Sequence, residues 1–318
     1  VLQRMTDMIA HRGPDSEGHY IDEHAALGHR RLSIIDLGGG QQPIYNEDGS
    51  KVITFNGEIY NYQTLREELI AAGHTFTTKS DTEVLLHGYE QWGVDLLQRV
   101  RGMFTFVIWD KNKQELFGAR DHFGIKPFYY AKMNGTFMYA SEIKSLLRHP
   151  DFVKELNAEA LKPYMTFQYP AIGETFFKGV YKLPEGHYFT YRDGKMDIHR
   201  YYDEDFREGK QKLGELVNSI DQTVCDSVKA HQIADVDVPR AGDDLHGLGL
   251  TDVDLADPHV VGVFMALHLE NFADDHVLEV FVGTLDGLDL RAGERHLVVE
   301  FLIGDILEVN EFVEPITG

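Results

Sequence analysis

The sequence is poor in cysteine, in basic residues and in long apolar runs. Its one cysteine, Cys225, excludes an internal disulfide and predicts a reducing, cytoplasmic environment. The longest apolar run is about eight residues, VVGVFMAL from Val260, far short of the roughly 18 residues that a membrane helix needs. No basic-then-apolar export signal follows Val1. We therefore expect a chain that does not enter a membrane.

The charge balance is strongly acidic. Asp and Glu number 52 against 30 Lys and Arg, for a formal net charge of −22 over 318 residues. A protein of this charge repels phosphate backbones. We therefore expect no nucleic-acid partner, and the length predicts about two domains.

Composition changes abruptly after Pro239. Residues 240–318 contain three basic and 17 acidic residues, and no Lys, Ser, Gln, Tyr, Trp or Cys. Two hypotheses remain open: a shifted reading frame, or a genuine acidic module. Asp and His occur together in DLADPH and ADDH, but no ligand spacing matches a known metal site, so we expect solvated charges and no bound metal.

The first part of the chain is predicted to be a mixed α and β domain. Strands are predicted at 25–37, 51–55, 102–110, 114–120 and 128–141, where β-branched and aromatic residues gather. Hairpin turns are predicted around 110–113 and at Asn134-Gly135. The pattern predicts antiparallel sheets.

Three helices are also predicted. The first covers about 63–72 and ends at Gly73, and the second begins at Ser80 with the capping-box pattern SDTE and ends at Gly93. The third covers about 211–231 and includes Cys225, which we expect to be a small packing residue.

Asn56-Gly57, within FNGEIYNY at 55–62, admits two interpretations. An Asn-Gly pair between strand-forming residues is a strong hairpin-turn signal. The same pair offers a side-chain amide and an unhindered backbone N–H, which are suitable donors to an oxyanion. The pair alone favours the turn.

Seven polar motifs occur in one order along the chain: HRGPDSEGHY (11–20), GHRRLSIIDL (28–37), FNGEIYNY (55–62), KSDTEVLLHGYEQWG (79–93), RGMFTFVIWD (101–110), ARDHFGIKPFYY (119–130) and ASEIKSLL (140–147). Together they resemble the glutaminase half of the asparagine synthetase family, a class II glutamine amidotransferase. The likeness continues through KLPEGHYF (182–189) and RYYDEDF (200–206), and DSVKAHQIADVDV (226–238) resembles the opening of that family's synthetase half.

The resemblance implies an α+β fold of the N-terminal-nucleophile hydrolase type, a four-layer αββα sandwich of antiparallel sheets between helices. It implies a glutaminase domain over 1–206 that lacks its first residues. A linker and the first helix of a synthetase-like domain follow over 207–239, and the acidic segment 240–318 stays unassigned.

The resemblance also implies glutamine as substrate. A cysteine thiolate would attack the carboxamide, and water would release glutamate after ammonia leaves. Asn56 and Gly57 would form the oxyanion hole, Arg31 would bind the α-carboxylate and Asp81 the α-ammonium. Further substrate contacts would come from Leu32, Ser33, Ile34, Ile35 and Glu58. We expect Asn56, Arg31 and Asp81 to converge on one cavity.

Each of these residues has a structural alternative. Arg31 follows Arg30 and could be a solvated charge, and Asp81 could simply cap the helix that it precedes. HRGPD, with Asp15, could be an ordinary turn. Glu58 could be an exposed strand residue.

Two departures from the family pattern limit the expected activity. No cysteine precedes HRGPD, so we expect that this polypeptide does not hydrolyse glutamine. After residue 238 the family's Gly-rich ATP loop is replaced by PRAGDDLHGLGL, so we expect no cofactor in this chain. ATP, Mg²⁺ and aspartate belong to the full-length family, a ligase that would act as a homodimer. Another class II amidotransferase and a non-catalytic glutamine-binding or assembly module remain alternatives.

Overall fold

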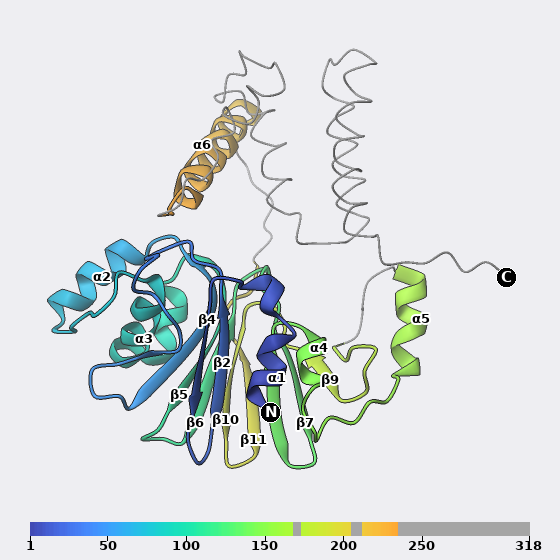
Figure 1. Ribbon diagram of the computed structural model, residues 1–318. Helices are drawn as coiled ribbons and strands as arrows, with labels where there is room; N and C mark the ends of the chain where they lie inside the picture. Colours follow the sequence, from blue (N-terminus) through green and yellow to red (C-terminus); the bar gives the residue numbers. More distant parts are fainter. Residues whose placement is uncertain (168–172, 205–211, 235–318) are drawn as a thin grey trace, which may run out of the picture. The chain divides into compact units, whose positions relative to one another are not determined.

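The computed structural model describes residues 1–167, 173–204 and 212–234 (Figure 1). The chain divides into two units, Val1–Val238 and Pro239–Gly318, and only the first contains described residues. The predicted acidic segment 240–318, with its reading-frame and metal hypotheses, therefore lies outside the described residues. In the described part, no helix is long and apolar enough to cross a membrane.

The centre of the first unit is a six-stranded antiparallel sheet. Its strands have the order β11-β10-β6-β5-β4-β3. Their bounds are β3 Ile44–Tyr45, β4 Lys51–Ile59, β5 Gly102–Asp110, β6 Glu115–Arg120, β10 His187–Arg192 and β11 Lys195–Arg200. The predicted hairpin at 110–113 joins β5 to β6 and is confirmed.

Two helices, α2 (Tyr62–Ala71) and α3 (Asp81–Trp92), cover one face of this sheet (Figure 1). Alternate residues of β4, among them Phe55, pack into the same buried cluster as Leu69 of α2 and Leu85 of α3. Every second side chain of β4 points to this face of the sheet and packs against the apolar faces of the two helices, and this contact holds α2 and α3 on β4.

The other face of the six-stranded sheet meets shorter strands. They are β1 (Ser16–Ile21) and β2 (Ala26–Arg31) in a two-stranded sheet, and β7 (Tyr129–Met133), β8 (Thr136–Ala140) and β9 (Val180–Lys182) in a three-stranded sheet. The predicted hairpin at Asn134-Gly135 joins β7 to β8. The second sheet layer therefore has two separate parts.

Alternation along β7 and β8 builds two cores. Tyr130 and Phe137 pack against the cluster between the sheets. Ala131 and Met138 belong to the outer cluster, which includes Leu146 of the short helix α4 (Ile143–Leu146) and contacts α1 (Leu2–Asp7). The order is helix, sheet, sheet, helix, so the predicted four-layer αββα sandwich is confirmed.

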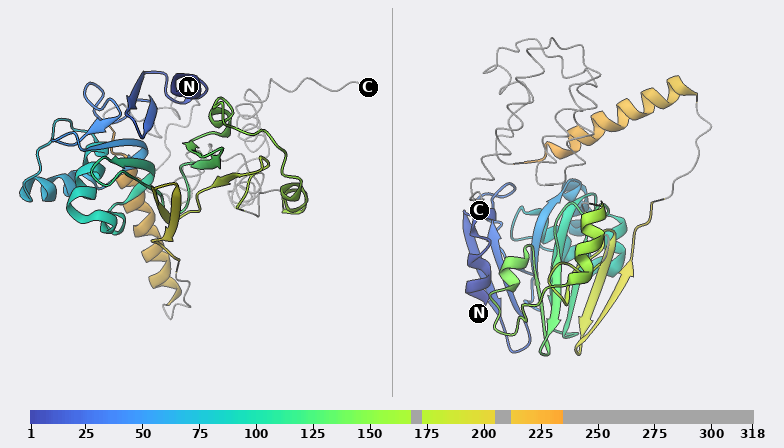
Figure 2. Two further views of the ribbon diagram at one scale, coloured as in Figure 1. Left: turned by 90° about the horizontal axis from the view of Figure 1, so that it is seen from below. Right: turned by 90° about the vertical axis from the view of Figure 1, so that its right-hand side faces the viewer.

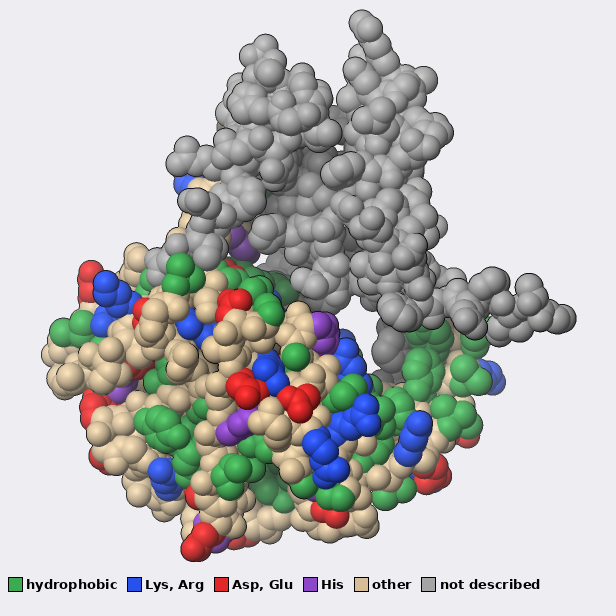
Figure 3. Space-filling model, viewed as in Figure 1, with side chains coloured by type: hydrophobic (Ala, Val, Ile, Leu, Met, Phe, Trp, Pro, Cys, Tyr) green, Lys and Arg blue, Asp and Glu red, His purple; other side chains and the backbone are tan. Residues whose placement is uncertain are grey.

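Ion pairs hold the outer helical layer in place. Arg30 of β2 pairs with Asp7 of α1, and Glu142 before α4 pairs with Arg12. Figure 3 shows acidic, basic and histidine side chains intermixed over this part of the surface. In Figure 2, α1 and the β1–β2 hairpin lie together along one side of the unit.

The predicted helix ends are confirmed at most positions. Gly73 follows α2 with φ +104°, Ser80 is the N-cap of α3 and Gly93 its C-cap. The predicted capping box is wrong, because the Glu83 carboxylate accepts hydrogen bonds from Thr77 and Thr78 and does not reach back to Ser80. The third predicted helix is α6 (Leu213–His231), on which Cys225 is a free, half-buried thiol. The remaining helices are α5 (Ala158–Phe167), η1 (Ala10–Arg12) and η2 (Gly93–Gln98).

Candidate functional site at the open edge of strand β4

Asn56 and Gly57 lie inside β4, where they pair with Thr105 and Phe104 of β5. The hairpin-turn interpretation is therefore wrong, because pairing with β5 extends the strand as far as Ile59. A Cβ atom at position 57 would lie 2.1 Å from the Met103 carbonyl oxygen. Close approach of the two strands thus requires glycine here.

The backbone amides of β4 alternate between β5 and the opposite edge. Tyr60 N–H donates to the Arg101 carbonyl oxygen on the β5 side at 2.7 Å, whereas the N–H groups of residues 55 and 59 point away from β5. Phe55 N–H donates to Gln42 Oε1 at 2.7 Å, and Ile59 N–H donates to Asp81 Oδ2 at 3.0 Å. Gly57 lies between Phe55 and Ile59, and its φ of +156° departs from the ordinary strand conformation.

This edge is open at Gly57 because β3 pairs only with Val52 and Ile53 of β4. Gln42 Nε2 also donates to the Phe55 carbonyl oxygen at 3.1 Å. The Gln42 side chain thus binds both backbone groups of Phe55, as a neighbouring strand would. The sequence analysis missed Gln42, since a lone Gln before Pro43 carries no local signal of this role.

Asp81 is the first residue of α3 and is only 4% exposed. The cap interpretation is wrong, because Ser80 caps the helix through its side chain, at 3.2 Å from the Thr82 N–H. Burial, with a smaller contribution from the negative charge of Glu58, raises the pKa of Asp81 to about 7 against hydrogen bonds that lower it. The fold therefore holds a carboxyl group that ionises near neutral pH.

Arg31 ends β2 and is only 6% exposed, so the solvated-charge interpretation is wrong. Its Nη2 donates to the carbonyl oxygens of Ile35 and Asp36 at 2.9 and 2.8 Å. A Cβ at Gly40 would lie 2.5 Å from that Nη2 and 3.3 Å from the Ser80 Cβ, so the guanidinium lies beside the start of α3.

The loop after β2 is tied to two neighbouring segments. Asp36 Oδ2 accepts a hydrogen bond from the Lys79 N–H at 2.8 Å, just before α3. Asp15 Oδ2 accepts one from the Ser33 N–H at 2.7 Å, and the Asp15 N–H donates to the Arg31 carbonyl oxygen at 3.0 Å. HRGPD is therefore more than a turn, because it fixes the exit of β2.

The other predicted contact residues differ in exposure. Leu32 is 56% exposed, whereas Ile35 is buried and Ile34 packs against the core under α2 and α3. Glu58 is half-buried on β4, so it is not an exposed strand residue. The half-buried Lys126 lies near it: burial lowers the pKa of Lys126, and the Glu58 charge opposes that change. Sequence analysis did not assign Lys126, although ARDHFGIKPFYY contains it.

A cavity of about 740 Å³ lies between the sheets, and Asn56, His29 and Thr54 are among its lining residues. Burial lowers the pKa of His29 to about 4, and its Nε2 lies 2.9 Å from the Phe55 carbonyl oxygen. Arg31 and Asp81 do not line this cavity. Asn56, Arg31 and Asp81 were expected to converge on one cavity, and this cavity does not bring them together. Side chains leave a sheet perpendicular to it, as Asn56 does, whereas Asp81 binds the edge of β4.

The chain is similar to several glutamine-hydrolysing asparagine synthetases. It is 46% identical to "Asparagine synthetase [glutamine-hydrolyzing] 1" of Bacillus subtilis over 75% of this chain and 38% of that protein. It is 36% identical to "Asparagine synthetase [glutamine-hydrolyzing] 3" of Bacillus subtilis, over 74% of this chain and 39% of that protein. A putative asparagine synthetase of Mycobacterium tuberculosis is 34% identical over 98% of this chain and 49% of that protein. The chain thus spans half or less of the length of these relatives.

Solved structures of two amidotransferase proteins are also similar. Glutamine phosphoribosylpyrophosphate amidotransferase of Bacillus subtilis gives a TM-score of 0.40 at 20% identity, over 56% of this chain and 35% of that chain. A class-II glutamine aminotransferase domain protein of Silicibacter pomeroyi gives 0.31 at 15% identity, over 49% and 69%. The glutamine amidotransferase domain family matches residues 1–202, well over half of the sequence. The chain belongs to the glutamine amidotransferase domain family.

Proposed function

We propose that this chain binds glutamine at the open edge of β4 and is the glutamine-handling half of a longer, glutamine-dependent asparagine synthetase. Family membership and the names of the relatives support this. The observation that carries the proposal is the edge of β4, where Gly57 lies between the Phe55 N–H, bound by Gln42, and the Ile59 N–H, bound by the ionisable Asp81.

In this proposal, each charge of the substrate meets a fixed partner. Gly57 N–H and the Asn56 side chain donate to the carboxamide oxygen, where a loss of one donor costs about 3 kcal/mol in the transition state. Asp81 pairs with the α-ammonium and Arg31 with the α-carboxylate. Backbone groups of Leu32, Ser33, Ile34 and Ile35 complete the contacts, beside Glu58.

Hydrolysis of glutamine through a thioester requires a thiolate at the carboxamide carbon. The one cysteine of these 318 residues is Cys225, on α6 and away from the β4 motif in sequence. We therefore propose that this polypeptide binds glutamine without releasing ammonia. The same observation favours a second candidate function, a non-catalytic glutamine-binding or assembly module.

The synthetase chemistry is assigned to the longer protein. We propose that ATP, Mg²⁺ and aspartate are bound by parts of such a protein that this chain does not contain, since it spans 38% of one asparagine synthetase relative. A cytoplasmic location and a homodimer remain part of the same proposal.

Calorimetric titration with glutamine tests the binding proposal. We expect Arg31→Lys and Asp81→Asn each to weaken glutamine binding at least about tenfold, because each removes a charge-assisted contact to the substrate's charged end. Asp193→Asn, a change at an exposed turn carboxylate, is the matched control and should bind as the wild type does. Equal affinities in all four proteins would overturn the assignment.

Ammonia release tests the catalytic part. A coupled assay of the 318-residue polypeptide should give no glutamine-dependent ammonia above a protein-free blank. Turnover that survives Cys225→Ala would show that another group attacks, and turnover that this change abolishes would place Cys225 in the reaction.

A further inference from the structure

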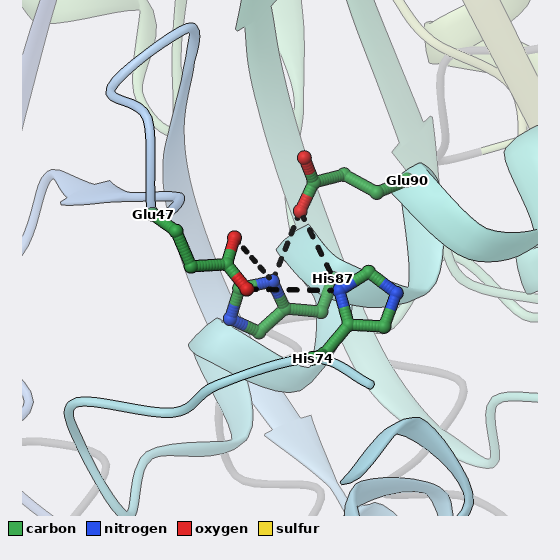
Figure 4. A group of neighbouring side chains, drawn as sticks. All are labelled: Glu47, His74, His87 and Glu90. Carbon is green, nitrogen blue, oxygen red and sulfur yellow. Dashed lines mark hydrogen bonds and ion pairs between the residues drawn. The ribbon is translucent and has the colours of Figure 1, made fainter. Parts of the chain in front are cut away.

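A second cluster of polar side chains lies where α3 meets the turn between β3 and β4 (Figure 4). It contains Glu47 from the turn between β3 and β4, His74 from the loop after α2, and His87 and Glu90 from α3. One ligand atom from each residue lies within 4.8 Å of the others. Three separate segments of the chain therefore meet at one point.

Both histidines turn the same ring nitrogen, Nδ1, toward the cluster. His74 Nε2 lies 3.2 Å from Gln91 Oε1, which accepts, so that nitrogen carries the proton and Nδ1 carries the lone pair. His87 Nε2 lies 3.5 Å from the Glu83 carboxylate without a hydrogen bond, and its Nδ1 lies 3.0 Å from Glu90 Oε2. An outer carboxylate or amide oxygen that fixes a ring in this way is the usual support of a metal-binding histidine.

Hydrogen bonds orient both carboxylates. Glu90 faces both histidines with Oε2, whereas Glu47 faces His74 with Oε1 and His87 with Oε2. Asn46 Nδ2 and Lys51 Nζ bind Glu90 Oε1, at 2.7 and 3.3 Å, whereas Glu90 Oε2 faces the rings. Glu47 Oε1 accepts from the Thr75 N–H at 3.1 Å, and its Oε2 lies 3.6 Å from His87 Nδ1. The orientation of both ligands is therefore built into the fold.

The four histidine-to-carboxylate distances, 3.0 to 3.9 Å, bracket the spacing of ligands in a tetrahedral site, and they use both oxygens of Glu47. Ligands about 2.0–2.1 Å from a zinc ion are about 3.3 Å apart in a tetrahedron. The corresponding distances are 3.0 Å from His87 Nδ1 to Glu90, 3.6 Å from His87 Nδ1 to Glu47, 3.8 Å from His74 Nδ1 to Glu47 and 3.9 Å from His74 Nδ1 to Glu90.

A shared proton explains this arrangement less well than a metal ion. A proton joins His87 Nδ1 to Glu90 at 3.0 Å, but at 3.8 and 3.9 Å His74 Nδ1 makes no hydrogen bond to either carboxylate. A divalent ion at the centre contacts all four groups and balances the two carboxylate charges. The side chain of His87 is fully buried, whereas that of Glu47 is 39% exposed, which leaves a path for an ion to enter.

We propose that Glu47, His74, His87 and Glu90 form a binding site for one divalent transition-metal ion, with zinc as the best fit. Two imidazoles and two carboxylates are ligands that zinc accepts in tetrahedral sites. The bound ion links the β3–β4 turn and the α2–α3 loop to α3, whose first residue is Asp81.

Zinc titration of the chelator-treated, tag-free protein tests this site. We expect one equivalent of Zn²⁺ in competition with a chromophoric chelator, and a zinc-dependent rise in the melting temperature. Glu47→Gln and His74→Ala should each weaken zinc binding at least about tenfold, since changes even to groups behind the ligands cost about 10–100-fold. Both residues are partly exposed, so these variants keep the buried His87 and the core intact.

Glu23→Gln and His199→Ala are matched controls, because both residues are exposed and lie outside the cluster. They should bind zinc with the affinity of the wild type. Visible absorption of the cobalt-substituted protein is a second measurement. The wild type and the controls should show the intense absorption of tetrahedral Co²⁺, and the two cluster variants should lose it. Wild-type protein that binds no zinc, or variants that bind it as tightly as the wild type, would overturn the proposal.

Discussion

The Asp81 carboxylate, at the first turn of α3, accepts the Ile59 N–H of β4 at 3.0 Å. This single bond joins the helix layer to the strand edge on which the candidate site lies. It also places a buried carboxyl group two residues along β4 from Gly57.

The buried Asp81 should make stability depend on pH. Its pKa is about 7 in the folded protein against an ordinary 3.8, so the folded state holds the proton more tightly and stability falls as pH rises from about 4 to 7. Asp81→Asn removes this ionisation. Relative to the wild type, its free energy of unfolding should rise over that interval by about 1.4 kcal/mol for each unit of pKa shift. Urea unfolding at several pH values measures this difference, and a difference that does not vary with pH would contradict the prediction.

Glutamine affinity should increase with pH and level off above about 7, because an ammonium group pairs only with ionised Asp81. Below that pH the affinity should fall about tenfold for each pH unit. Calorimetry in buffers of different ionisation enthalpy should then detect proton release on binding at pH 6. Asp81→Asn is the control, since its weaker binding should not vary between pH 6 and 8. Wild-type affinities that agree at the two pH values would exclude this role.

Gly57→Ala should destabilise the fold as well as the site. The added methyl group would lie 2.1 Å from the Met103 carbonyl oxygen, so β4 and β5 must separate. Overpacking of this kind costs about 1–3 kcal/mol. Gly38→Ala is the control, because its Cβ meets nothing within 4 Å, and it should stay within about 0.5 kcal/mol of the wild type. Equal urea midpoints for the two variants would contradict the close approach of these strands.

Gln42→Ala should leave the buried Phe55 N–H without its side-chain acceptor. An unsatisfied buried donor costs about 1–3 kcal/mol, and glutamine binding should weaken because the strand edge beside Gly57 loses a contact that holds it. Gln63→Ala, at an exposed position of α2, is the matched control. Urea unfolding and glutamine calorimetry on both variants measure the two effects. A Gln42→Ala protein as stable as the control would show that water replaces this contact.

Local signals in the sequence predicted those features that neighbouring residues control. Ser80 and Gly93 delimit α3, and Asn134-Gly135 forms the β7–β8 turn, because caps and tight turns depend on the φ and ψ preferences of a few consecutive residues. The ordered motifs likewise identified the family. The Asn-Gly turn signal failed at Asn56-Gly57, where pairing with β5, about 50 residues later in the chain, holds the same dipeptide in a strand.

The sequence by itself predicted the helices α2, α3 and α6, the β5–β6 and β7–β8 hairpins and the family of this protein. Only the tertiary structure decided which side chains meet. Gln42 and Asp81 bind alternate amides of one strand edge, and Glu47 meets His74 and His87 across three segments. Such contacts join residues far apart in the chain, and their distances follow from how helices pack on a sheet rather than from any spacing along the sequence.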